Sequence, residues 1–270
     1  MIEKMKHRGT VLIVGAGEVA SAVAHRLWMS KFMVVMTEVP RPLAVSRGTC
    51  FSEAVYDGSK TIEGVTAKLV NPSITEIRRC LKNGEIPVVV DPECKIREKL
   101  KPEILVEASM RKRRCEITMK DAPITIGLGP GWCAGKDVHL VVETNHSNNL
   151  GRVIEIGKAE ENTKIPVSIG GFTTERVVWA DRDGIFFSEK NIADRVKKGE
   201  IIGRIKNHLI KAPLQGMLRG LLRSGVKVTK GTKLIEIDPL SPSQVSFVIR
   251  DKMRAIAGGV LEAILRLAPY

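Results

Sequence analysis

The chain has 270 residues, of which 43% are hydrophobic, so it is long enough to bury a substantial core and to form two domains. Its net charge of +13 favours anionic partners such as nucleotides, phosphorylated cofactors or acidic proteins. The same charge would suit nucleic acid, but aromatic residues make up only 4%, which argues against the stacking surfaces that bind single strands. The basic residues are spread out apart from one run, Arg111 to Arg114, which is typical of a solvated face, so nucleic acid is not an expected partner.

Two further absences bear on where the protein acts. No apolar run reaches transmembrane length, and the first ten residues lack the apolar region of a signal peptide, so we expect a cytoplasmic protein without membrane association. The five cysteines form no C-x-x-C pair and no spacing typical of metal ligands. We therefore expect free thiols in a reducing compartment and no metal site.

The first predicted elements surround a glycine-rich turn. Residues 10–14 read as a buried strand, and residues 18–30 read as a helix. Between them Gly15, Gly17 and Ala20 have the G-x-G-x-x-G/A spacing of nucleotide-binding turns. In that motif the first glycine allows the tight turn, the second lets the backbone approach a phosphate, and the third small residue lets the helix pack on the strand. This pattern predicts a nucleotide or dinucleotide site.

Glu38 supports that prediction. It ends the apolar run that follows the helix, about 20 residues beyond the glycines, where an acid would bind a ribose hydroxyl. The helix N-terminus would offer unpaired N–H groups to an anion. The alternative interpretation is a turn that is retained for packing and binds nothing.

Strand-like and helix-like stretches continue to alternate up to about residue 150, which predicts a Rossmann-like parallel sheet with helices on both faces. Further strands are expected at 66–70, from 86 to its end in Asp91-Pro92, at 104–108 and at 122–129, and helices at 74–84 and 94–103. Ligands of such sheets bind at the carboxyl ends of the strands. Glu38, Asp91, Glu107 and the loop after Leu128 fall at these ends.

That last loop, "GLGPGWCAGKDVH", is a second glycine-rich stretch. Gly129, Gly131 and Lys136 could hold a phosphate or a pterin near the first turn, or the glycines could serve only a crossover that needs positive φ angles. Cys133 lies beside Lys136, whose charge would favour a thiolate, so Cys133 is the first candidate nucleophile and Cys50 the second.

An internal repeat marks the C-terminal region. Residues 180–205 align without gaps on residues 212–237, offset by 32 residues, and each half reads as short strands separated by glycine turns. The pattern is similar to that of the biotinyl and lipoyl carrier domains and predicts a barrel-sandwich hybrid over about 178–240. The apolar faces of the halves could be buried within one chain or between two copies, which leaves a homo-oligomer open.

Covalent biotin or lipoate is not expected. The segment that joins the halves, "KNHLIK", has Lys206 but lacks the flanking methionines of the biotin type. We therefore divide the chain into a Rossmann-like domain at 1–150 and a C-terminal region at 151–270, which ends in a helix. Gly258 and Gly259 lie inside that helix and indicate either close packing or a break.

Several stretches together resemble the YqeB family of the selenium-dependent molybdenum hydroxylase system, nearly from end to end. They include "VGAGEVASAVAHRL", "VVMTEVPRPLAVSRG", "GLGPGWCAGKDVHLVVETN", "ERVVWADRDGIF" and "DKMRAIAGGVLEAIL". Members are similar in their Rossmann part to accessory proteins of the XdhC type. The resemblance implies an accessory or maturation factor that handles the molybdenum cofactor or a nucleotide. The implied partners are a molybdenum hydroxylase or other maturation proteins.

Two other functions remain open from the residues. An NAD-dependent oxidoreductase would use Gly15, Gly17, Ala20 and Glu38, and the acid would favour NAD over NADP. However, the C-terminal region shows no acid and base pair suited to a substrate. A nucleotide sensor without catalytic activity, similar to the regulatory domains of potassium uptake systems, would share the "VGAGEVA" opening.

Overall fold

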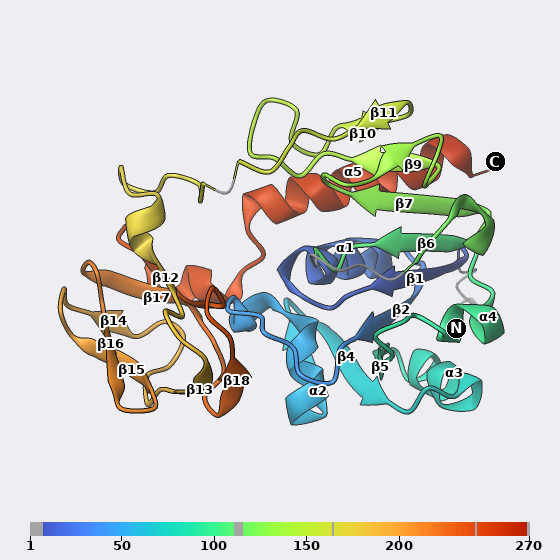
Figure 1. Ribbon diagram of the computed structural model, residues 1–270. Helices are drawn as coiled ribbons and strands as arrows, with labels where there is room; N and C mark the ends of the chain where they lie inside the picture. The colour runs from blue at the N-terminus through green and yellow to red at the C-terminus, as the bar shows by residue number, and fades with distance from the viewer. Residues whose placement is uncertain (1–7, 111–115, 164, 241, 269–270) are drawn as a thin grey trace. The chain divides into compact units, whose positions relative to one another are not determined.

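The computed structural model describes residues 8–110, 116–163, 165–240 and 242–268 (Figure 1). The contacts divide the chain into two compact units. The first contains Met1–Pro42, Cys50–Thr163 and Ile249–Tyr270, and the second contains Leu43–Thr49 and Lys164–Val248. The first unit is therefore assembled from both ends of the sequence.

The first unit is built on a nine-stranded sheet, in the order β10-β9-β7-β6-β1-β2-β5-β4-β3. Its interior strands run parallel, and β3 and β10 pair antiparallel at the two edges. A separate two-stranded ladder joins β8 to β11. The bounds are β1 Thr10–Val14, β2 Met33–Glu38, β3 Ser59–Ile62, β4 Val65–Val70, β5 Ile86–Val90, β6 Ile104–Glu107, β7 Ile124–Leu128, β8 Cys133–Ala134, β9 Leu140–Val142, β10 Val153–Ile154 and β11 Gly157–Lys158.

Helices cover both faces of this sheet. Leu27 of α1 and Ile256 of α5 belong to the core cluster on one face, and Ile77 of α3 and Ile96 of α4 belong to the cluster on the other. The α/β sheet and the C-terminal helix are as predicted, whereas the antiparallel edge strands were not expected. The helices are α1 Glu18–Met29, α2 Ala54–Asp57, α3 Ile74–Lys82, α4 Ile96–Leu100 and α5 Asp251–Leu267.

Helix α5 continues through its two glycines without a break. Gly259 is required by packing, because a Cβ at this position would lie 2.1 Å from the carbonyl oxygen of Gly151. At Gly258, by contrast, no described atom outside its chain neighbours and the nearby backbone of its own helix lies within 4 Å of the place that a Cβ would occupy. Close packing therefore explains Gly259 and leaves Gly258 without a structural reason.

The second unit contains two four-stranded sheets, in the orders β12-β19-β17-β14 and β16-β15-β13-β18. All of their strand pairs are antiparallel. The bounds are β12 Val177–Trp179, β13 Gly184–Phe187, β14 Arg195–Val196, β15 Ile201–Ile205, β16 His208–Lys211, β17 Gly216–Leu221, β18 Val226–Val228 and β19 Lys233–Asp238.

The strand register of these sheets repeats at the same 32-residue offset as the sequence. Gly184 pairs with Val228 between β13 and β18, and Gly216 pairs with Val196 between β17 and β14. Because each of these pairs joins one half of the repeat to the other, the halves exchange strands. Neither half therefore completes a sheet alone.

Candidate functional site

The first glycine turn connects β1 to α1 and needs only one of its two glycines for folding. Gly15 has a φ of +96°, and a Cβ there would lie 2.7 Å from the Cα of Ser109. Gly17 has an ordinary φ of −70°, and no described atom lies within 4 Å of where its Cβ would be. Ala20 is fully buried in the core between helix and sheet. Packing and backbone strain therefore explain Gly15 and Ala20 but not Gly17.

Glu38, at the end of β2, is buried and faces this turn. One of its carboxylate oxygens accepts the N–H of Ala16 at 2.8 Å, and the other accepts the N–H of Val39 at 2.7 Å. A carboxylate oxygen can accept more than one donor, so these bonds are compatible with a ligand hydroxyl as a further partner. Sequence spacing and structure thus agree in bringing Gly15, Gly17, Ala20 and Glu38 together.

The N-terminus of α1 lies beside two cations, Arg250 and Lys252, that no sequence motif indicates. No side chain of the described ranges caps this helix end, so its first N–H groups suit an anion. The Nε of Arg250 lies 3.2 Å from a carboxylate oxygen of Glu18 in the first turn. Burial of Lys252 lowers its pKa, and among the charges that act on it are those of Glu18 and Arg250. Arg250 and Lys252 are more than 230 residues from the turn, and no local pattern connects them to it.

A short 3₁₀ helix, Phe51–Glu53, covers the other side of the turn. The N–H of Ser52 donates to the carbonyl of Ala16 at 2.8 Å, while the buried Ser52 hydroxyl has no partner among the described residues. Cys50 is fully buried just before this helix. Desolvation, together with the nearby charges of Glu18 and other carboxylates, raises the pKa of the Cys50 thiol well above 9.0. The structure therefore disfavours Cys50 as a nucleophile.

The carboxylates of the other acids at strand ends accept hydrogen bonds from backbone N–H groups. Glu107, the last residue of β6, accepts the N–H of Ser109 at 3.1 Å and the indole N–H of Trp132 at 3.2 Å. Asp91, after β5, accepts the N–H of Ile96 at 2.7 Å. These contacts give both residues a structural role in shaping the loops at the edge of the sheet.

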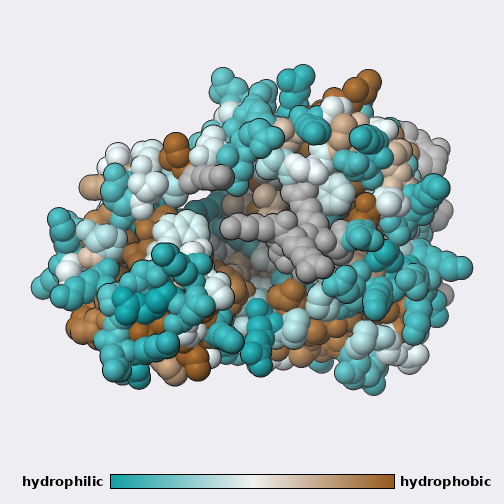
Figure 2. Space-filling model, viewed as in Figure 1, coloured by the Kyte–Doolittle hydropathy of each residue, from teal (hydrophilic) through white to brown (hydrophobic). Residues whose placement is uncertain are grey.

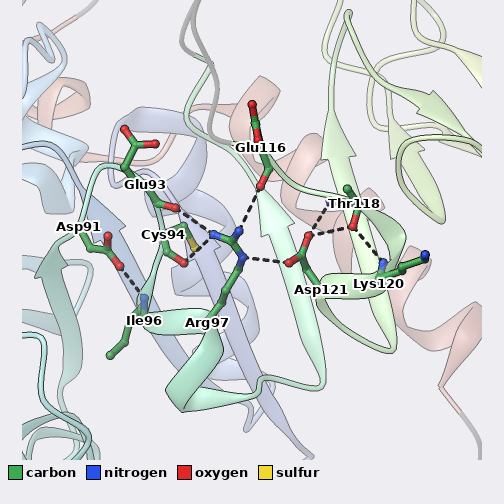
Figure 3. Close-up of polar contacts among 9 residues, drawn as sticks. All are labelled: Asp91, Glu93, Cys94, Ile96, Arg97, Glu116, Thr118, Lys120 and Asp121. Carbon is green, nitrogen blue, oxygen red and sulfur yellow. Dashed lines mark hydrogen bonds and ion pairs between the residues drawn. The ribbon is translucent and has the colours of Figure 1, made fainter.

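Arg97 of α4 connects two of these loops (Figure 3). Its guanidinium donates to the carbonyls of Glu93 and Cys94 after β5, and its Nε lies 2.9 Å from the Asp121 carboxylate before β7. The Asp121 carboxylate also accepts the N–H of Thr118 at 2.7 Å. The ion pair is thus part of a network that fixes the loops, and none of its residues belongs to the glycine turn.

The second glycine-rich loop is a crossover, and it separates its predicted site residues. Gly129 follows β7 with a φ of +69°, and a Cβ there would lie 2.3 Å from the hydroxyl of Thr144. Gly131 is exposed with a φ of +94°. One strand, β6, separates β7 from β1, so Gly129 lies about 10 Å from the first turn along the same edge.

Lys136 lies toward the end of the sheet where the parallel strands begin, whereas the first turn lies at the end where they finish. It sits in the tight turn before β9, where the N–H of His139 donates to the carbonyl of Thr125 near the start of β7. The structure does not bring Lys136 together with Gly15 and Gly17, because the loop returns the chain to the start of a parallel strand. Cys133, in β8, is half-buried and pairs with Lys158 of β11.

The remaining expectations concern charge, metal and membrane. The basic run at 111–114 and Cys115 lie outside the described residues. Within the described ranges, no group of three or more His, Cys, Asp or Glu side chains is placed to hold a metal ion. No helix of that part of the chain combines the length and apolar character needed to cross a bilayer.

Fold and site together define an α/β protein with a glycine turn at the carboxyl ends of its parallel strands, and with a second unit of two antiparallel sheets. No family model matches the chain. The uncharacterized protein YqeB of Escherichia coli is 46% identical to it over 257 residues, which is 95% of the chain. This similarity supports membership of the YqeB family. The chain spans about half (47%) of the length of that relative.

Two solved structures are remotely similar to the chain. The ectoine utilization protein EutE (DoeB) of Ruegeria pomeroyi aligns with a TM-score of 0.26 at 8% identity, over 87% of this chain and 86% of that chain. An aspartoacylase family protein of Mesorhizobium loti aligns with a TM-score of 0.27 at 10% identity, over 86% of both chains. Scores this low carry no argument about fold or function.

Proposed function

We propose that this protein is an accessory or maturation factor for selenium-dependent molybdenum hydroxylases and binds a nucleotide portion of the molybdenum cofactor at the Gly15–Gly17 turn. In this proposal the first unit is a Rossmann-like domain, and the second is a barrel-sandwich hybrid without a covalent cofactor. The pathway rests on the resemblance to the YqeB family. The binding site rests on the geometry of the turn.

Gly17 is the observation that supports this site most directly. The fold gives no reason for glycine at this position, since its φ is ordinary and the space around it is open among the described residues. A ligand that must approach the backbone closely supplies such a reason. The residues present also fit a nucleotide: the N-terminus of α1 suits a phosphate, and the buried Glu38 carboxylate suits a ribose hydroxyl.

Charge around the turn adds to this support. Glu18 would repel a phosphate at the start of α1, but Arg250 lies 3.2 Å from its carboxylate and offsets that charge. Lys252 is in the first turn of α5 and interacts electrostatically with Glu18. The two cations would let an anionic ligand approach a helix end that begins with an acid.

The test is native mass spectrometry of protein purified anaerobically from a host that makes molybdopterin. We expect a bound mass that matches a pterin or its dinucleotide and that is lost in Gly17→Leu. Gly258→Ala is the matched control, because Gly258 lies in an α5 position that is equally open to a side chain. A bound NAD would instead support the oxidoreductase or the nucleotide sensor. Equal ligand content in Gly17→Leu and the control would contradict the proposed site.

A cellular measurement addresses the pathway separately. In the host cell, the wild-type protein is replaced by its Cys133→Ser variant. The selenium content and the activity of the molybdenum hydroxylases are then measured. Loss of both is expected if the half-buried Cys133 thiol handles selenium, since selenium transfer needs a nucleophile. Unchanged selenium content would remove Cys133 from the mechanism while leaving the nucleotide site to the first test.

A further inference from the structure

The second unit exposes an apolar surface on the sheet β16-β15-β13-β18. We name its solvent-facing side the outer face. Antiparallel sheets with one solvated side normally carry polar residues there. Here the buried side is formed by residues such as Phe186 and Ile210, and the outer face is apolar as well. Its apolar side chains are between 40 and 49% exposed and are Ile185, Phe187, Ile201 and Leu209.

The strand register brings these side chains together. Phe187 pairs with Arg204, and Arg204 pairs with Leu209, so the three form one row across β13, β15 and β16. The Arg204 guanidinium lies 4.9 Å from the centre of the Phe187 ring. A groove of about 290 Å³ is lined by this row together with Ile201 and Ser224. Figure 2 shows apolar side chains in brown among hydrophilic ones over this part of the unit.

The charged side chains that the four strands carry on the outer face are all positive. Arg204, Lys211 and Lys227 are exposed on its strands, and the described residues of these four strands include no carboxylate. Lys190 lines the groove and is paired with Glu200 at 2.6 Å. Glu189 also lines the groove. The outer face is thus both apolar and cationic.

In the other sheet of the unit, the surface that the internal repeat makes equivalent to the outer face is covered by the chain. The 32-residue offset places Ile185 on Met217 and Phe187 on Arg219, both of which are buried. The chain itself covers this surface: the hydroxyl of Ser246 contacts the Met217 sulfur at 3.2 Å, and Arg219 donates to the carbonyl of Val248 at 3.1 Å. The neighbouring N–H of Leu221 donates to the carbonyl of Val45 at 2.9 Å. The covering elements are the loop that contains Val45 and the 3₁₀ helix Ser243–Phe247 with the residue after it, so this surface is covered by polypeptide.

We propose that the outer face binds a segment of a partner polypeptide that combines carboxylates with aliphatic or aromatic side chains. The repeat indicates that this surface accepts polypeptide, and the cations among its apolar residues select for acidic side chains. A second copy of the chain fits poorly, because two copies that each carry a charge of +13 would bring like-charged faces together. This inference goes beyond the proposed function and does not depend on a nucleotide site.

The test measures binding of labelled peptides to the full chain by fluorescence anisotropy. The probe is a peptide of alternating glutamate and leucine. The comparison peptides carry lysine in place of glutamate or serine in place of leucine. We expect the glutamate–leucine peptide to bind most tightly and its affinity to fall as salt is raised. Phe187→Ser and Arg204→Glu should each weaken it by about tenfold or more, as expected for central contact residues.

Lys230→Glu is the matched control, because it reverses an exposed charge on a turn of the same unit outside the outer face. Circular dichroism establishes that each variant is folded. Equal affinity in the wild type, Phe187→Ser and Arg204→Glu would overturn the proposal. Tight binding of the lysine–leucine peptide would overturn its charge selection. Self-association in sedimentation that disappears in Phe187→Ser would assign the outer face to a second copy instead.

Discussion

The carboxylate of Glu38 accepts a hydrogen bond from the N–H of Ala16 at 2.8 Å and so joins the end of β2 to the glycine turn that begins α1. The acid is buried and also accepts the N–H of Val39. Because an ionised carboxylate forms strong hydrogen bonds to N–H groups, the conformation of the turn depends on Glu38 before any ligand arrives. The same side chain that would recognise a ribose therefore also organises the turn that would hold the phosphate.

Substitution of Gly15 should reduce the stability of the protein, whereas substitution of Gly17 should affect nucleotide binding and leave stability nearly unchanged. Gly15→Ala should lower the free energy of unfolding by about 2 kcal/mol or more, because the residue has a φ of +96° and its Cβ would meet the Ser109 backbone. Gly17→Ala should change stability by less than about 0.5 kcal/mol, since its φ is ordinary and the space is open. Urea denaturation measures both values. Retained nucleotide binding in Gly17→Ala and the bulkier Gly17→Leu would argue that the turn serves packing only.

The paired glycines of α5 give opposite expectations one residue apart. Gly259→Ala should destabilise the protein by about 2 kcal/mol, because its Cβ would collide with the Gly151 carbonyl. Gly258→Ala should stabilise it by about 1 kcal/mol, since alanine is the better helix former and no described atom obstructs the side chain. Thermal denaturation of the two variants side by side is the measurement. Equal effects would mean that α5 packs on the sheet differently.

Stability should also depend on Glu63 at acidic pH. Partial burial would raise its pKa, but hydrogen bonds from Arg254 and from the N–H of Ile249 outweigh burial and lower the pKa below its usual value of 4.5. A lowered folded-state pKa adds stability above the unfolded value, and that stability is lost as pH falls through the folded value. Glu63→Gln should therefore flatten the decline in stability below about pH 4.5. Its cost at neutral pH should stay under about 1 kcal/mol, because Arg254 is 42% exposed.

The described cysteines should differ in reactivity. Cys133 is half-buried, whereas Cys50, Cys80 and Cys94 are buried. Burial raises the pKa of Cys50 well above 9.0 and that of Cys80 to about 11, so both thiols stay protonated at neutral pH. Brief alkylation with iodoacetamide followed by peptide mapping should modify Cys133 before the other three. Faster modification of Cys50 would show that the segment over the glycine turn opens in solution.

Local patterns predicted the first sheet well because its strands and helices are continuous and apolar. The spacing of Gly15, Gly17 and Glu38 was sufficient to place those residues together, because one turn and two adjacent parallel strands fix their positions. The hairpin β3–β4 was predicted only in its second strand, because the half-exposed sequence of β3 has little apolar character. The crossover after Gly129 was equally hard to predict, since glycines indicate flexibility but not the direction of the chain.

The cations beside the turn could not be predicted from the sequence. Arg250 and Lys252 reach α1 only because α5 packs beside it, and a contact between residues so distant in sequence leaves no periodic signal. The buried state of Cys50 was unexpected for a similar reason. Its pKa depends on Glu18, Glu38 and Glu53, which come from three different elements. Each of these findings depends on tertiary packing.

The division of the first unit has a consequence for how the protein is made. Its sheet is encoded before residue 164, but α5, which packs against α1, is encoded after Ile249. A ribosome must therefore finish the whole second unit before the apolar surface of α1 can be covered. During this interval Leu27 and its neighbours depend on other protection from aggregation. Termination of synthesis before Asp251 would leave that surface permanently open.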